Sequence, residues 1–180
     1  MSSDTAFAAG RTVLARPLAI ALLIAVVGMA TIGAAWVYQS LGYAPCELCL
    51  KERLPYYAAI PVALATAVAA AFRSRTAVMA GFSLIVLCFM AGTALGLYHA
   101  GVELKLWSGP TECSGVTATP TDVGDFFKQL DSVNVVRCDV AAIKVLGLSL
   151  AIWNALVCLG LLGLANAGLL SAGRPAIRGG

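Results

Sequence analysis

Long apolar stretches alternate with short polar segments along the chain. Four stretches contain no Asp, Glu, Lys or Arg, and they are Pro17–Tyr38, Leu54–Phe72, Thr76–Gly101 and Val145–Gly173. About 20 helical residues cross the hydrocarbon core of a bilayer, because an α-helix rises 1.5 Å per residue. Each stretch reaches roughly that length. The pattern predicts an all-α membrane protein, a four-transmembrane-helix bundle.

The polar segments between these stretches indicate where the loops lie. We expect a single integral membrane domain over residues 1–180, with helices at about 17–38, 54–72, 76–98 and 145–170, and with a short loop at about 39–53 and a long loop at about 99–144. The first stretch is longer than the apolar core of a signal peptide, so we expect it to be retained as a helix.

Composition supports the membrane prediction and narrows the partners. The chain is 60% hydrophobic and 12% charged, whereas soluble domains average about 25% charged residues. The lipid bilayer is therefore the first predicted partner, and no nucleic-acid partner is predicted.

The distribution of cations predicts the orientation. Four spans put both termini on one side, and the 12 Lys and Arg residues divide evenly between the two sides. On the side of the termini they lie within the short segments 1–16, 73–75 and 171–180, whereas the opposite loops are much longer. The positive-inside rule then favours cytoplasmic termini by density. Four of the six cysteines lie in the opposite loops and none lies on the side of the termini, which suits an oxidising periplasm because disulfides persist there.

Two cysteine pairs supply the candidate chemistry. Cys46 and Cys49 form a Cys-x-x-Cys motif in the short loop, and Cys113 and Cys138 lie in the long loop. A Cys-x-x-Cys motif is either a redox disulfide or half of a metal site, and spacing alone does not separate them. Two pairs on one membrane face favour electron transfer through thiols. A tetrathiolate metal site is the alternative, but the second pair lacks close spacing, and no metal is predicted.

Other polar residues near the motif have two interpretations each. Arg53, one helical turn beyond Cys49, either stabilises a thiolate and orients a ligand or anchors the helix at the interface. His99, the only histidine, either hydrogen-bonds a ligand carbonyl or lies in the interface with a water partner. Cys88 and Cys158 lie deep in apolar stretches, where thiols usually serve packing.

Aromatic and small residues also have a recognisable placement. Tyr and Trp residues gather at the loop-side ends of the predicted helices, which is typical of an interfacial belt, although the same rings could flank a flat lipid-soluble ligand. Gly92 and Gly96 form a Gly-x-x-x-Gly motif, which predicts close helix packing within the bundle.

Several motifs together resemble one family. They are Pro45–Tyr57, Tyr98–Glu103, Gly109–Cys113, Arg137–Asp139, Gly147–Ser149 and Trp153–Asn154. Over about residues 15–165 the sequence resembles the bacterial disulfide-bond formation protein B (DsbB) family. Vitamin K epoxide reductase-like proteins also combine four spans, cysteine pairs and quinone, but their loop cysteines precede the Cys-x-x-Cys. Ile143 departs from the pattern, because many members carry an aromatic residue there.

The resemblance implies a function and a location. Such proteins are protein-thiol:quinone oxidoreductases of the bacterial inner membrane, here with cytoplasmic termini. They reoxidise a periplasmic DsbA-like thioredoxin-fold protein and pass its electrons to membrane quinone, either ubiquinone or menaquinone.

The resemblance also implies a role for each cysteine. The partner's thiolate would attack Cys113. Cys138 would pair with Cys113 and exchange with Cys46, and Cys49 would then face the quinone. The implied cofactor-binding residues are Arg53 and His99, near the polar ring of the quinone.

Overall fold

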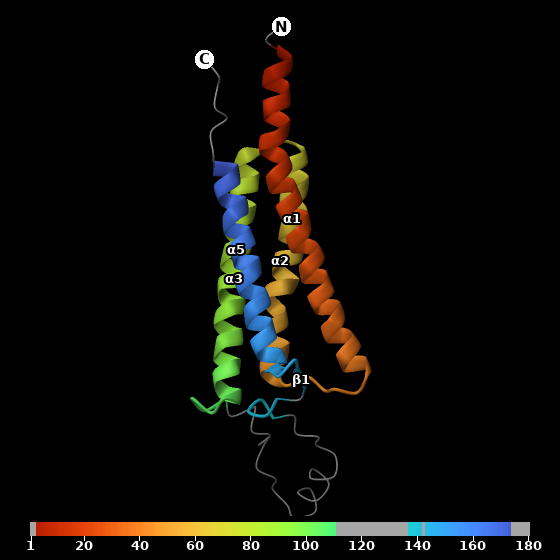
Figure 1. The fold of residues 1–180 in the computed structure, drawn as a ribbon, viewed down its shortest axis with the longest axis vertical. Coiled ribbons are helices and arrows are strands. Elements are labelled where there is room, and N and C mark those ends of the chain that lie inside the picture. The colour runs from red at the N-terminus through yellow and green to blue at the C-terminus, as the bar shows by residue number, and fades with distance from the viewer. Residues whose placement is uncertain (1–2, 111–136, 142, 174–180) are drawn as a thin grey trace, which may run out of the picture.

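Four long helices form an antiparallel bundle in the computed structural model (Figure 1). The structure describes residues 3–110, 137–141 and 143–173, with the backbone alone for residues 3–15. The helices are α1 (Ser3–Ser40), α2 (Glu47–Ala71), α3 (Arg75–Glu103) and α5 (Leu150–Gly173). Each contains a segment long and apolar enough to cross a membrane. The predicted four-helix membrane fold is confirmed.

The helices pack in a ring in which α1 contacts α2, α2 contacts α3, α3 contacts α5, and α5 contacts α1. The core contains small and medium apolar side chains from all four helices, including Ala21, Ile24, Ala63, Phe82 and Leu161. Large apolar side chains also cover the outside of the bundle; Val26, Val68, Leu87 and Leu159 are examples. An apolar exterior over a packed interior is what a bundle surrounded by lipid requires.

The Cys-x-x-Cys motif lies in the first turn of α2 rather than in a loop. The charge-free stretch begins at Leu54, but the helix begins at Glu47, with Cys46 as its N-cap. The Cys49 backbone N–H donates to Cys46 Sγ across 3.2 Å, which satisfies one of the free amides of a helix start. Charge did not mark the boundary, because a charged first turn at a membrane surface stays helical.

A hairpin precedes α5 where the charge-free stretch predicted continuous helix. Strands β1 (Lys144–Val145) and β2 (Leu148–Ser149) pair antiparallel, with Val145 opposite Leu148. Leu146 and Gly147 have φ of 52° and 83°, so the chain reverses there through left-handed backbone. Ser149 Oγ then accepts the Ile152 N–H across 3.3 Å and caps α5.

Close contact between α3 and α5 confirms the packing predicted for the Gly-x-x-x-Gly motif. A Cβ added at Gly96 would lie 3.0 Å from the Ala155 Cα, and one at Gly92 would lie 2.9 Å from the Cys158 Sγ. The two backbones approach because these positions carry no side chain. The approach places Cys158, and Asn154 one turn earlier on α5, against the interior of the bundle.

Candidate functional site

The start of α2 brings Cys46 and Cys49 together. Their Sγ atoms lie 2.6 Å apart, near the bonded separation of about 2.05 Å in a disulfide. Cys46 is buried, whereas Cys49 is half-buried. The pair is positioned to open and close one disulfide, and its two sulfurs face different surroundings.

Cys46 faces a buried histidine that a carboxylate holds. His99 on α3 places Nε2 3.7 Å from Cys46 Sγ and donates its Nδ1–H to Glu52 Oε1 on α2 across 2.9 Å. His99 and Glu52 are only 3% and 7% exposed. A second carboxylate, Glu103, lies 4.0 Å from Nε2. One imidazole is therefore fixed between carboxylates and the sulfur of Cys46.

These contacts favour the thiolate form of Cys46 in the reduced pair. Hydrogen bonds from the Cys49 thiol, from His99 and from the Cys49 backbone N–H lower the pKa of the Cys46 thiol to about 5, although burial opposes the shift. A thiol with a low pKa is a good leaving group in thiol–disulfide exchange.

Cys138 shares a buried cluster with this pair. It belongs to one buried cluster with Cys46, Leu48 and Val102, and Cys49 packs against that cluster. Cys138 is disulfide-bonded. Its predicted partner, Cys113, lies outside the described residues.

Ion pairs hold the segment around Cys138 to the end of α3. Asp139 accepts hydrogen bonds from Arg137 across 2.8 and 2.9 Å and also pairs with Lys105, just beyond α3. The Arg137 guanidinium and the Lys105 ammonium hold the pKa of the Asp139 carboxyl well below its usual range. These exposed pairs contribute little stability each, and the Lys105 pair joins the segment around Cys138 to the chain just beyond α3.

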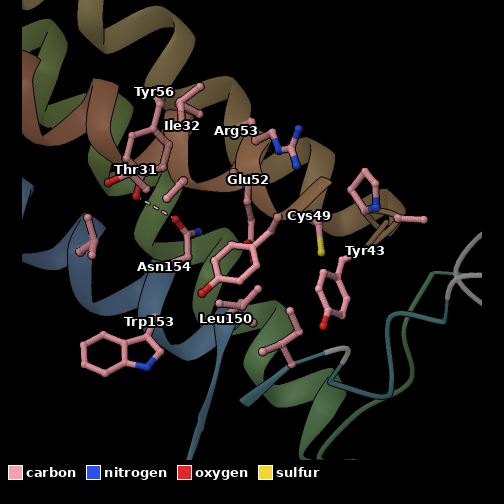
Figure 2. A pocket seen from close by; sticks show the side chains of 18 residues that line it. Thr31, Ile32, Tyr43, Cys49, Glu52, Arg53, Tyr56, Leu150, Trp153 and Asn154 are labelled. Atoms are coloured by element: carbon pink, nitrogen blue, oxygen red, sulfur yellow. Dashed lines mark hydrogen bonds between the residues drawn. The ribbon is translucent and has the colours of Figure 1, made fainter. Parts of the chain in front are cut away.

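Cys49 opens onto a cavity of about 330 Å³ between α1, α2 and α5 (Figure 2). Its walls are mostly apolar and aromatic, as is usual for ligand pockets. Lining residues include Ile32, Tyr38, Tyr43, Tyr56, Ile143, Leu150 and Trp153. Aromatic residues that the sequence placed in an interfacial belt thus also form the wall of a pocket.

The two predicted cofactor-binding residues lie in different places. Arg53 lines the cavity and donates to Gln39 Oε1 on α1 across 2.9 Å. His99 contacts Cys46 and Glu52 and is not among the described residues that line the cavity. The His99 ring lies next to the cavity lining, because it contacts Glu52, which lines the cavity together with Cys49.

A polar network crosses the inner wall of the cavity. The Cys158 thiol lies 3.2 Å from the Tyr56 hydroxyl and donates to it, and that hydroxyl donates to Asn154 Oδ1 across 2.8 Å. The other amide atom, Asn154 Nδ2, is buried and has no hydrogen-bond partner in the described part of the chain. Sequence reasoning assigned Cys158 to packing and gave Asn154 no role. The available signal was an amide side chain within a charge-free stretch.

The donor atoms of Cys46, Cys49 and His99 lie within 4.8 Å of one another, close enough to hold a soft cation such as Zn²⁺. The predicted tetrathiolate alternative would need Cys46, Cys49, Cys113 and Cys138 as thiolates, and Cys138 is disulfide-bonded.

Comparisons with known proteins agree with this geometry. Residues 17–168 match the family described as "Disulfide bond formation protein DsbB". The chain is 31% identical over 166 residues to "Disulfide bond formation protein B 1" of Pseudomonas fluorescens (strain Pf0-1), covering 87% of this chain and 91% of that protein. It is 29% identical over 117 residues to "Uncharacterized protein RP370" of Rickettsia prowazekii, covering 64% of this chain and 65% of that protein. No solved structure matches the chain.

Proposed function

Because this chain belongs to the family of disulfide bond formation protein DsbB, and is thereby a disulfide-forming oxidoreductase of a membrane, we propose that it reoxidises a DsbA-like protein with membrane quinone. One observation carries the proposal. A single cysteine pair connects both ends of the route, since Cys46 shares a buried cluster with Cys138 and Cys49 lines the cavity. Electrons could therefore enter the pair at one sulfur and leave it at the other.

Electrons first reach the loop cysteines. The thiolate of the DsbA-like partner attacks Cys113 and breaks the Cys113–Cys138 bond, so Cys138 leaves as a thiolate. The second thiolate of the partner then attacks the mixed disulfide and releases Cys113. The partner departs oxidised, and the loop pair holds two electrons.

Exchange then moves these electrons to α2. The Cys138 thiolate attacks Cys46 Sγ, the Cys46–Cys49 bond breaks, and Cys49 leaves as a thiolate. Cys113 next attacks Cys138, which restores the loop disulfide and releases the Cys46 thiolate. The packing of Cys138 with Cys46 in one buried cluster supports this order.

His99 and Glu52 assist the release of Cys46. The imidazole Nε2 lies 3.7 Å from the sulfur, and Nδ1 is held by a carboxylate at 2.9 Å. An imidazolium in this position would lie between the Glu52 carboxylate and the departing thiolate, and both anions would stabilise it. We therefore assign His99 to the thiolate of Cys46, and Arg53 to the ligand in the cavity.

The residues of the cavity fit a quinone. A volume of about 330 Å³ accommodates a ring-sized head group, the walls are largely apolar, and Arg53 supplies a cation for a polar oxygen. When bound, a quinone supplies the terminal oxidant: it accepts two electrons and two protons while the Cys46–Cys49 disulfide re-forms. Ile143 takes part in the lining through aliphatic contact.

The metal-binding alternative has less support. The donor set of Cys46, Cys49 and His99 offers three ligands, and Cys138, one of the four cysteines of the tetrathiolate hypothesis, is disulfide-bonded. Counting free thiols in membranes with and without a chelator separates the two hypotheses. A metal site predicts thiols that appear only after chelation, whereas the redox route predicts thiols that appear only after reduction.

The function is tested by anaerobic quinone reduction. Purified protein is supplied with a reduced thioredoxin-fold dithiol protein and a short-chain ubiquinone, and quinone loss is followed by its absorbance. We expect one quinol for each partner disulfide formed, and no turnover in the Cys138→Ser variant. Partner oxidation without quinol formation under strict anaerobiosis would overturn the proposal.

We also propose that the cysteine end of the bundle faces the periplasm and that the termini are cytoplasmic. After reduction of whole cells, a membrane-impermeant maleimide should label Cys46, Cys49, Cys113 and Cys138. Labelling that requires disruption of the inner membrane would reverse the orientation.

A further inference from the structure

We propose that Asn154 binds the head group in the cavity by donating a hydrogen bond from Nδ2 to a carbonyl oxygen of the ring, and that the Tyr56 hydroxyl positions its amide. This inference rests on the proposed function, because it names a ligand contact of the same site. Asn154 belongs to α5, whereas Arg53 belongs to α2, so the ring would meet donors from two helices.

The first observation is a buried hydrogen-bond donor that lacks an acceptor among the described residues. Asn154 lines the cavity, and its Nδ2 atom is buried and has no hydrogen-bond partner in the described part of the chain. Leaving such a donor unpaired costs about 1–3 kcal/mol, so buried polar groups without partners call for a specific reason. The reason here is an acceptor that arrives with the ligand.

The second observation is that neighbouring groups fix the direction of the amide. The Tyr56 hydroxyl accepts the Cys158 S–H, so its own proton needs an acceptor. Asn154 Oδ1 is that acceptor at 2.8 Å. Because the oxygen is committed to Tyr56, which is only 1% exposed, the NH₂ group must take the other side. Figure 2 shows this bond beside Cys49 and Arg53 in the same cavity.

The chemistry of the unmet group selects the ligand class. An amide N–H needs an acceptor, and in a mostly apolar cavity that acceptor belongs to an otherwise apolar molecule. A quinone carries carbonyl oxygens on opposite edges of a flat ring. Arg53 and Asn154 can therefore hold opposite edges of the quinone ring, because α2 and α5 lie diagonally across the four-helix bundle.

Binding without turnover tests this contact. In a Cys46→Ser/Cys49→Ser background we would titrate a short-chain ubiquinone analogue and follow tryptophan fluorescence, because Trp153 lines the cavity. Asn154→Leu keeps the side-chain size and removes the donor. We expect its Kd to rise about fivefold, as loss of one neutral hydrogen bond implies. Tyr56→Phe should weaken binding less, since the amide remains but loses its orientation.

Asn166→Leu is the matched control. It makes the same change on the same helix, but Asn166 Nδ2 is exposed and already donates to Leu162 O. This variant should bind quinone with the Kd of the parent.

Infrared spectra of the bound quinone give a readout that a merely structural role would not change. The parent should show a carbonyl stretch lowered by hydrogen bonding, and Asn154→Leu should return that band toward its position in apolar solvent. Unfolding without ligand is measured in parallel, because Asn154→Leu removes the unpaired Nδ2 donor but also removes the acceptor of the Tyr56 hydroxyl, and these two effects on stability oppose each other.

Parent-like Kd and carbonyl bands in Asn154→Leu would overturn the contact, with water in the cavity then satisfying Nδ2. Failure of the parent background to bind any quinone would instead overturn the proposed function.

Discussion

The two halves of the bundle bury very different side chains. In the half near Ala71 and Gly173, the interior is apolar, and the buried hydroxyl of Thr66 is satisfied within its own helix by Val62 O at 2.7 Å. The half near Cys46 buries Glu52, His99 and Ser149 and contains a cavity with an unpaired amide nitrogen. Both halves cross the same membrane, so lipid solvation does not explain the difference.

The contrast separates residues that hold the bundle from residues that perform its chemistry. Buried charged and polar groups cost free energy unless they are paired. At the cysteine end Glu52 and His99 pair with each other beside Cys46, and Ser149 caps α5. Among the described residues of the opposite half, the buried polar side chain is Thr66, which bonds within its own helix. That half gains its stability from close packing. Substitutions in one half should therefore affect electron transfer, and those in the other should affect folding.

The largest expected effect is on turnover. Cys49→Ser should lower quinone reduction by at least about a thousandfold, because a serine oxygen cannot form the disulfide that carries the electrons. Helix content by circular dichroism should stay unchanged. Cys88→Ala is the control, because Cys88 lies on α3 away from the cavity, and it should keep the activity within about twofold. If both variants lost quinone reduction to a similar extent, the proposed difference in role between Cys49 and Cys88 would be wrong.

The packed half should respond in stability. Gly168→Leu should lower the free energy of unfolding by about 2 kcal/mol or more, because a Cβ there would lie 2.3 Å from a ring carbon of Phe82. Gly163→Leu makes the same change on the same helix with open space around the Cβ, and it should cost less than about 0.5 kcal/mol. Thermal unfolding in detergent measures both. Equal destabilisation would show that the core does not pack as described.

Arg53→Lys should weaken quinone use at normal protein level. If the guanidinium orients a carbonyl, an ammonium is a poor substitute, and the apparent KM for quinone should rise about tenfold. Exchange between Cys138 and Cys46 should continue, since Arg53 lines the cavity and does not belong to the cluster around Cys138. Unchanged quinone kinetics would leave Arg53 as an interface anchor.

The smallest expected effect concerns pH. In the reduced protein the pKa of Cys46 is lowered to about 5, so its thiolate should persist above that pH and be lost as the pH falls through it. Glu52→Gln removes the carboxylate that holds His99 and should raise this midpoint by about half to one unit. Absorbance of the thiolate near 240 nm measures the midpoint, and Cys46→Ser identifies its contribution.

Glu47→Gln is the matched control for that shift. Glu47 lies on the same helix but pairs with Lys51 across 3.3 Å at the surface. Its substitution should leave the midpoint unchanged. An equal shift in both variants would mean that overall charge, not His99, determines the pKa of the Cys46 thiol.

The sequence by itself determined the fold class. Charge-free stretches of membrane-spanning length predicted four helices, and a Gly-x-x-x-Gly motif predicted their close packing, because both depend on local composition. The helix boundaries were less predictable. The first turn of α2 carries charges, and the hairpin before α5 is uncharged after Lys144, so charge marked neither boundary.

The sequence also supplied the cysteine pairs and Arg53, because thiol chemistry and its spacing are local signals. Tertiary structure alone decided which sulfur faces which neighbour. His99 and Glu52 are far apart in the chain yet meet at Cys46, and Tyr56 and Cys158 meet at Asn154. Pairing between buried polar groups depends on which helices are adjacent and on how far along each helix the groups lie. No periodicity within one helix encodes that information.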